Sequence, residues 1–157
     1  MDELTPSLHA PRFGLLLGTM TCHRCQASTP SAAVWVPGYR EIDDEDDSLP
    51  ACADAGLLQY VQWVDPAAQA QILARAPWLR FAATHMSGTT YLANHCQVCG
   101  SLQGDHFVFH PDGPFWPQED VDVARLVFVP CRGPLKAVGT VGHSMWMDRV
   151  EQLAGRE

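Results

Sequence analysis

The chain has no long hydrophobic run, and this excludes a membrane-spanning helix, which needs roughly 20 consecutive apolar residues. The short leucine run at 15–17 precedes Cys22 as in a lipoprotein signal. However, Asp2 and Glu3 stand where such a signal is positively charged. We therefore expect a cytoplasmic protein with no membrane partner, in a compartment where thiols stay reduced.

Basic residues are also scarce. The 157 residues include 10 Lys and Arg against 18 Asp and Glu, so the net charge is −8, and the basic residues form no stripe. Phosphate contacts need a basic surface, so nucleic-acid binding is disfavoured. Six acidic residues lie within 41–47, and without them the net charge is −2. We expect residues 41–50 to form a solvated acidic loop; a contact for a basic partner and mimicry of nucleic acid are the sharper alternatives.

The motifs of common enzymes are missing as well. The chain has no glycine-rich phosphate loop, no His-Glu-x-x-His, no nucleophile elbow and no deaminase signature. We therefore do not expect an enzyme and assign no catalytic residue. The alternative is a hydrolase or thiol enzyme with a site near His85, Asp105 and His106, which together with Gln103 could line a polar cleft.

The chain does contain two Cys-x-x-Cys pairs, Cys22 with Cys25 and Cys96 with Cys99. One tight turn can present both thiols of a pair to one ion, so two turns supply the four thiolates that tetrahedral Zn²⁺ prefers. Closing the loop of about 70 residues between the pairs costs about 4 kcal/mol, whereas structural zinc yields on the order of 10–16 kcal/mol. We predict one structural Zn²⁺ on these four cysteines, because four thiolates leave no open position for catalysis.

Other interpretations of the cysteines stay open at this point. One pair at the start of a helix would suit thiol redox chemistry, six cysteines could form three disulfides in a secreted chain, and thiols can simply pack in a core. His23 and His95 adjoin the thiols and could support them by hydrogen bonds or replace one as a ligand. Cys52 and Cys131 have no close partner in the sequence, which favours an apolar packing role.

Residues on both sides of each pair are typical of β-strands. The segments 12–20 and 89–94 run into the pairs, and β-prone runs at 33–36 and 107–109 begin about eight residues after the second cysteine. Strand, metal turn and strand therefore occur twice, as a weak internal repeat.

Two such hairpins around one ion resemble the zinc-ribbon and rubredoxin-like proteins. In that group a glycine such as Gly100 follows the second cysteine and permits the positive φ of the turn, whereas the first turn departs from the pattern with Gln26. The segment 91–107 also resembles a signature of uncharacterised bacterial proteins, Tyr-x-x-Asn-x-Cys-x-x-Cys-Gly-x-x-Gln-Gly-Asp. These resemblances imply a zinc-binding fold but no activity.

The whole chain, 1–157, is expected to form a single zinc-stabilised α+β domain that is rich in β-structure. Residues 1–11 are polar and broken by prolines, which predicts a loose arm. Further strands are expected at 57–64, 124–129 and 135–138.

Two helices are predicted. Asp65 followed by Pro66 is typical of an N-cap and first helical residue, so we expect a mid-chain helix over 67–76. A C-terminal helix is expected over 144–153, capped by Ser144. The run at 107–109 would instead place His106 and His110 on one strand, about 13 Å apart and too far to share an ion.

These features favour a zinc-stabilised interaction or adaptor module whose partner is another protein. A nucleic-acid-associated regulator is the first alternative, and the hydrolase or thiol enzyme is the second.

Overall fold

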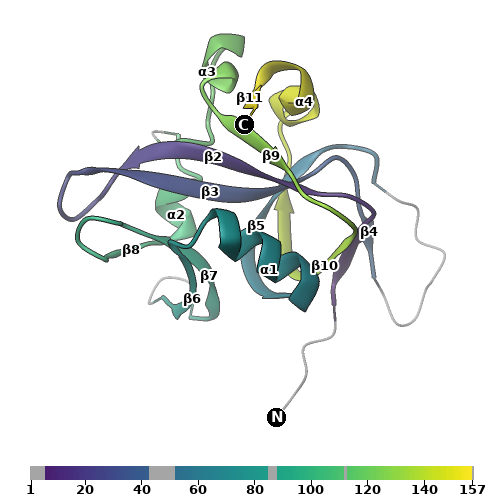
Figure 1. Ribbon diagram of the computed structural model, residues 1–157, viewed down its shortest axis with the longest axis horizontal. Helices are drawn as coiled ribbons and strands as arrows, with labels where there is room; N and C mark the ends of the chain where they lie inside the picture. The colour runs from purple at the N-terminus through teal and green to yellow at the C-terminus, as the bar shows by residue number, and fades with distance from the viewer. Residues whose placement is uncertain (1–5, 43–51, 85–87, 112, 157) are drawn as a thin grey trace.

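The computed structural model describes residues 6–42, 52–84, 88–111 and 113–156. The strands form an eight-stranded sheet in the order β11-β9-β2-β3-β5-β10-β1-β4 and a three-stranded sheet in the order β6-β7-β8 (Figure 1). The strands are β1 (Leu8–Ala10), β2 (Gly14–Thr21), β3 (Ser28–Val36), β4 (Arg40–Glu41), β5 (Gly56–Val64), β6 (Leu79–Ala83), β7 (Thr90–His95), β8 (Leu102–Gln103), β9 (Val127–Pro130), β10 (Leu135–Gly142) and β11 (Gly155–Arg156). The helical elements are α1 (Pro66–Arg75), α2 (Asp105–Val108), α3 (Asp120–Ala124), the 3₁₀ helix η1 (Met145–Arg149) and α4 (Val150–Leu153). The α+β class is confirmed.

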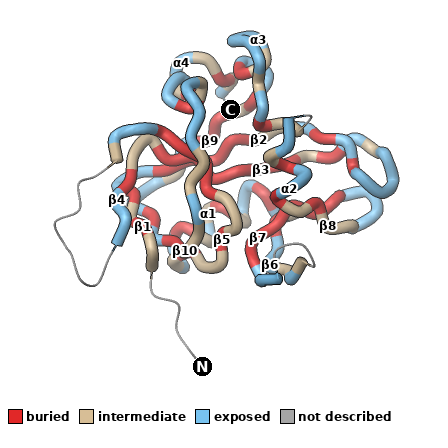
Figure 2. Tube along the Cα trace, turned by 180° about the vertical axis from the view of Figure 1, so that it is seen from behind, coloured by how far each residue is buried: buried red, intermediate tan, exposed pale blue. Residues whose placement is uncertain are grey.

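The hairpin of β2 and β3 forms the centre of the larger sheet. Its strands pair along their whole length, from Gly14 opposite Trp35 to Thr21 opposite Ser28. Successive side chains alternate between two core clusters, with Leu15 in one and Leu16 in the other. Because both faces are buried, these strands read as nearly continuous apolar runs in the sequence. Figure 2 shows the hairpin as a mostly buried band.

Helix α1 covers one face of this sheet. The Asp65 side chain accepts a hydrogen bond from the Ala68 N–H at 3.0 Å, and Pro66 is the first helical residue. Ala68 and Ile72 are buried against the core cluster that contains Leu15. The predicted mid-chain helix and its cap are confirmed.

The opposite face is covered by α2, α3, η1 and α4. The Trp35 indole N–H donates to the carbonyl of Met147 at 2.8 Å and anchors η1 to the sheet. The predicted C-terminal helix over 144–153 is therefore wrong in its first half, which is a 3₁₀ helix, and Ser144 makes no side-chain capping hydrogen bond. Met147 of η1 and Val150 of α4 are three residues apart and both pack in the core cluster that contains Leu16. This spacing matches the three residues per turn of a 3₁₀ helix.

Three further expectations are corrected. Within the loose arm predicted for 1–11, Leu8–Ala10 forms β1, which pairs with β10 and β4 and buries Leu8 and Ala10. The strand predicted at 107–109 is wrong, because the chain turns into α2 after the two residues of β8 and buries Asp105 and Val108. The predicted strand at 124–129 begins later, at Val127, because α3 extends to Ala124. The strands predicted at 57–64 and 135–138 are confirmed as β5 and the start of β10.

The smaller sheet lies along the part of the β3 edge that has no paired strand. Among the described residues, β3 pairs with β5 only at Trp35 and Val36, so its earlier part has no strand on that side. Asn94 of β7 fills this place, since its side chain accepts from the Ala32 N–H at 2.8 Å and donates to the Ala32 carbonyl at 3.1 Å. The buried amide therefore makes the two hydrogen bonds that the backbone of a neighbouring strand would make, and it joins the two sheets.

Two sequence expectations concern residues outside this description. Most of the acidic loop predicted at 41–50 lies outside the described residues, although Glu41 belongs to β4. His85 also lies outside them. Among the described helices none is long and apolar enough to cross a membrane.

Candidate metal centre

The two Cys-x-x-Cys pairs occupy turns with the same hydrogen-bond pattern. In the first turn, Cys22 N–H donates to the Ala27 carbonyl at 2.8 Å and Gln26 N–H donates to the Cys22 carbonyl at 3.0 Å. In the second turn, Cys96 N–H donates to Ser101 at 2.9 Å and Gly100 N–H donates to Cys96 at 2.8 Å. We call residues 22–27 the first knuckle and residues 96–101 the second knuckle. The first joins β2 to β3 and the second joins β7 to β8.

The departure of the first knuckle from the glycine pattern does not change its backbone. Gln26 adopts a φ of 65°, close to the 79° of Gly100 at the equivalent position. A side chain in this left-handed region costs roughly 1–2 kcal/mol. The first knuckle therefore has the same turn as the second, although its sequence lacks the glycine that is typical of this turn.

The four predicted ligands come together. The sulfur atoms of Cys22, Cys25, Cys96 and Cys99 all lie within 4.8 Å of one another. Cys22 Sγ is 3.7 Å from Cys99 Sγ, and Cys25 Sγ is 3.8 Å from Cys96 Sγ. Four sulfurs at about 2.3 Å from one ion would stand about 3.8 Å apart at the corners of a tetrahedron. The arrangement can therefore bind one metal ion.

N–H groups surround these sulfurs. Cys22 Sγ accepts from the backbone N–H of Arg24 at 3.3 Å and of Cys25 at 3.4 Å, and Cys96 Sγ accepts from Val98 N–H at 3.4 Å. The side-chain amide of Gln103 donates to Cys22 Sγ at 3.2 Å. Hydrogen bonds of this kind stabilise the thiolate form, which is the form that binds metal.

Burial and hydrogen bonding have opposite effects on the thiol pKa values. Burial raises the pKa of Cys22, but the N–H groups of Cys25 and Arg24 together with the Cys99 and Cys25 thiols lower it to about 6. The pKa of Cys96 is also lowered, chiefly by the backbone of Cys99. For Cys25 the backbone of Ala27 lowers the pKa, but burial and the neighbouring thiols raise it to about 11. Four thiolates repel one another, and a dication would remove that repulsion.

The rival interpretations fare differently. All six cysteines are free thiols, so the disulfide interpretation is wrong for this structure. His23 and His95 do not join the cluster of possible ligands. Their rings hydrogen-bond to carbonyl oxygens instead, His23 to Leu102 at 3.2 Å and His95 to Ala93 at 3.0 Å.

The other two cysteines lie apart from this centre. Cys52 and Cys131 are partly buried and pack against the core cluster that α1 covers, as an apolar role requires. Burial raises the pKa of Cys131, although Arg75 lowers it, so this thiol resists ionisation.

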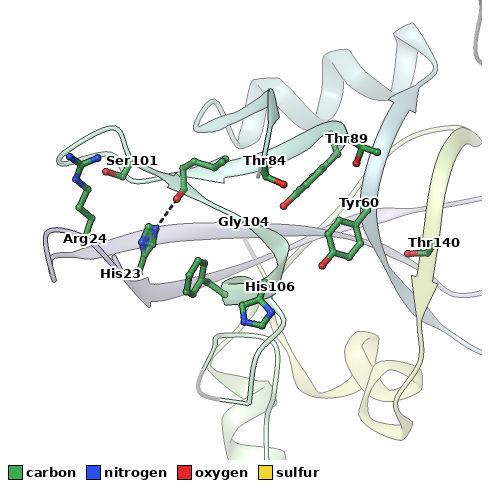
Figure 3. A pocket seen from close by; sticks show the side chains of 12 residues that line it. His23, Arg24, Tyr60, Thr84, Thr89, Ser101, Gly104, His106 and Thr140 are labelled. Carbon is green, nitrogen blue, oxygen red and sulfur yellow. Dashed lines mark hydrogen bonds between the residues drawn. The ribbon is translucent and has the colours of Figure 1, made fainter. Parts of the chain in front are cut away.

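A cleft of about 690 Å³ opens beside the knuckles. It is lined by His23, Arg24, Tyr60, Thr84, Thr89, Tyr91, Ser101, Leu102, Gly104, His106, Phe107 and Thr140. In Figure 3, Arg24, His23 and Ser101 lie at one end, whereas Tyr60, Thr89 and Thr140 lie at the other. The sequence offered a polar cleft next to the second pair as an alternative, and the structure has a cleft at this place.

Its lining differs from the polar group that the sequence suggested. His106 lines the cleft, but Gln103 is fully buried under the first knuckle. His106 and His110 are on consecutive turns, with ring centroids 5.9 Å apart, so the predicted separation of about 13 Å along a strand is wrong.

Asp105 lies beneath the cleft, with only 5% of its surface exposed. Its carboxylate accepts from the Tyr60 N–H at 2.6 Å, and its own N–H donates to the Tyr91 hydroxyl at 2.9 Å. Burial raises the pKa of Asp105 to about 7, although the Tyr60 N–H opposes this shift. Tyr60 itself has a φ of 52°, where β5 is irregularly paired with β10. Asp105 therefore holds a strained residue at the wall of the cleft.

Asn94 and Gln103 are residues of this centre whose roles the sequence patterns did not reveal. Both are fully or almost fully buried amides in the hairpin that carries the second knuckle. The available signal was an amide within an apolar, strand-forming segment, because such a group must find hydrogen-bond partners inside the protein.

Comparison of the chain with protein-family models, with curated proteins and with solved structures gave no match. The case for a metal centre therefore depends on the geometry of the two knuckles.

Proposed function

We propose that Cys22, Cys25, Cys96 and Cys99 bind one Zn²⁺ and that this ion is structural. The observation that carries the proposal is the pair of sulfur separations, 3.7 and 3.8 Å, which match the edge of a tetrahedral zinc–thiolate site. Four sulfurs complete the coordination shell, whereas a catalytic zinc keeps one position for water or substrate. The two knuckles then correspond to the paired hairpins of a zinc ribbon.

In this proposal the ion works as a clasp between the two sheets. One knuckle belongs to the long β2–β3 hairpin and the other to the short β7–β8 hairpin. Gln103 strengthens the joint, since its side chain bonds both Cys22 Sγ and, through Oε1, the His23 N–H at 3.2 Å. The hydroxyl of Thr29 accepts from Gln97 N–H at 3.0 Å and adds a further link.

We further propose that the protein is a cytoplasmic interaction module and not an enzyme. Support comes from apolar side chains at the two knuckles that remain exposed to solvent. Val98, at the tip of the second knuckle, is 68% exposed, and Phe107, beside the first, is 39% exposed. An exposed apolar group held on a rigid turn suits contact with another protein.

Metal analysis tests the zinc proposal. Purified protein should contain one equivalent of zinc, and cobalt-substituted protein should show the absorption of tetrahedral thiolate coordination. Cys22→Ser and Cys96→Ser should lose the metal and the ordered structure of the second knuckle, because each removes a ligand. The matched controls are Cys52→Ser and Cys131→Ser, which should keep one equivalent. A wild-type protein that contains no metal and still keeps both knuckles ordered would overturn the proposal.

Charge substitution tests the interaction proposal. Val98→Asp should keep the metal and the melting temperature, because the side chain lies in solvent, but should abolish capture of a partner that wild-type protein retains. The control is Val121→Asp, since Val121 is also exposed, at 52%, but lies on α3. Equal capture by all three proteins would reject the knuckle as the contact. Deletion of 41–47 should separately show whether the acidic run takes part.

A further inference from the structure

The cleft beside the knuckles has a composition unlike the rest of this acidic protein. None of its described lining residues is Asp or Glu, although the chain carries a net charge of −8. Arg24 lies at its knuckle end, and no described carboxylate forms an ion pair with it (Figure 3). A guanidinium that pairs with no described carboxylate, at the end of a cleft whose described lining has no acidic group, is suited to a phosphate, which it can bind through two parallel hydrogen bonds.

The aromatic rings of the lining offer flat, apolar surface. The Phe107 ring packs against His23 with centroids 4.4 Å apart, and Tyr60 packs against Tyr91 with centroids 5.0 Å apart. Tyr91 is almost fully buried and supports Tyr60 from behind, while Phe107 remains partly in solvent. Aromatic faces in this setting are suited to stacking of a planar ring such as a nucleobase.

The far end of the cleft carries hydroxyl groups. Thr89, Thr140 and the Tyr60 hydroxyl are found there, with Thr84 between the two ends (Figure 3). The Thr140 hydroxyl donates to the Gln59 carbonyl at 3.3 Å. A hydroxyl oxygen has two lone pairs, so these groups can still accept from the polar edge of a base or from a ribose. The volume of about 690 Å³ lies within the range of small-molecule sites, about 300–1,000 Å³.

We propose that this cleft binds one nucleotide unit, with its phosphate on Arg24, its base between Phe107 and Tyr60, and its polar edge toward the threonine hydroxyls. The unit is either a free nucleoside monophosphate or the phosphorylated end of a single strand. The proposal goes beyond the interaction function, and it rests on the zinc proposal because Arg24 lies within the first knuckle, where its N–H donates to Cys22 Sγ. A single phosphate contact needs no basic stripe, so the acidity of the chain is no obstacle.

Calorimetric titration of zinc-loaded protein with adenosine, guanosine, cytidine and uridine 5′-monophosphates tests the proposal. At least one should bind at one site per chain, more tightly than its nucleoside or inorganic phosphate alone. Arg24→Ala should weaken binding by roughly tenfold to a hundredfold, because a hydrogen bond to a charged group is worth about 1.5–3 kcal/mol. Phe107→Ala should weaken it through lost stacking. Arg132→Ala is the control, since Arg132 is exposed in a turn away from the cleft, and it should bind as wild type does.

Further measurements separate the sources and the modes of failure. A short 5′-phosphorylated single strand that competes at equal or higher affinity assigns the site to a strand end, and one that fails to compete assigns it to the free nucleotide. Zinc content is measured on every variant. If Arg24→Ala loses the ion, the binding by Phe107→Ala decides the test instead. Zinc-loaded wild type that binds none of the four monophosphates at millimolar concentration overturns the cleft proposal and leaves the zinc proposal standing. Equal binding by wild type and both cleft variants also overturns it.

Discussion

The two knuckles reach one backbone shape by different means. The second has glycine at the left-handed position and belongs to a short hairpin in which β7 and β8 pair at only two positions. The first has Gln26 there and closes a hairpin that is paired over eight positions. A long hairpin can hold a costly residue in its turn, whereas a short one depends on glycine and on what binds it. The first knuckle is therefore a platform, and the second is the part that must be fixed to it.

Removal of the metal should separate the two knuckles most strongly. Chelation of the zinc-loaded protein is expected to raise amide hydrogen exchange in residues 96–103 by orders of magnitude, while β2 and β3 keep most of their protection. The reason is that β2 and β3 retain their mutual hydrogen bonds without the ion. Exchange followed by mass spectrometry checks this. An equal loss in both hairpins would refute the distinction between platform and attached part.

Asn94→Ala should have the next largest effect. The Asn94 side chain satisfies the N–H and carbonyl of Ala32 and accepts from the Trp78 indole N–H at 3.0 Å. Leaving these buried groups without partners should lower the free energy of unfolding by about 3–5 kcal/mol. Denaturant titration checks this value, with Thr90→Ala at the exposed start of β7 as the control. A loss no larger than that of the control would show that the sheets are joined elsewhere.

Asp105, which follows the second knuckle, should make the stability of the protein depend on pH. Burial raises its pKa from 3.8 to about 7, so between these values the folded state holds a proton that the unfolded state has released. The free energy of unfolding should therefore fall as the pH rises through this window, by up to about 4 kcal/mol. Asp105→Asn keeps an acceptor for the Tyr60 N–H and should flatten that slope relative to wild type. The comparison is made by denaturant titration of zinc-loaded proteins, and parallel slopes would refute it.

Exchange of residues at the left-handed position should give the smallest effects. Gly100→Ala is expected to cost roughly 1–2 kcal/mol through φ alone, because nothing lies within 4 Å of an added Cβ. Gln26→Gly should be neutral or stabilising by less than about 1 kcal/mol, since relief of strain is offset by greater freedom of the unfolded chain. Thermal melts of both variants with equal zinc content check this. A destabilising Gln26→Gly would mean that its amide, which donates to the His23 carbonyl at 3.4 Å, matters more than the backbone strain.

Local signals carried the parts of the fold that the sequence could predict. Asp65 and Pro66 specified the start of α1, and alternating or continuous apolar runs specified β2 and β5. Cysteine spacing brought out the four sulfurs because two thiols per turn is a local pattern that zinc chemistry explains. Burial of Leu8 in β1 and the helical turn at Asp105 depend on distant partners, β10 and Tyr60, so no local pattern contained them. The lining of the cleft beside the knuckles comes from five separate segments, so no local pattern predicted it either.

The edge of β3 that has no paired strand matters while the protein is being synthesised. Asn94 and the second knuckle cover that edge, yet they are synthesised more than fifty residues later than β3. Until they dock, β3 offers unpaired backbone groups to any extended chain, which is a recognised start of aggregation. Zinc supply during expression should therefore determine the yield of soluble protein as well as its stability once folded.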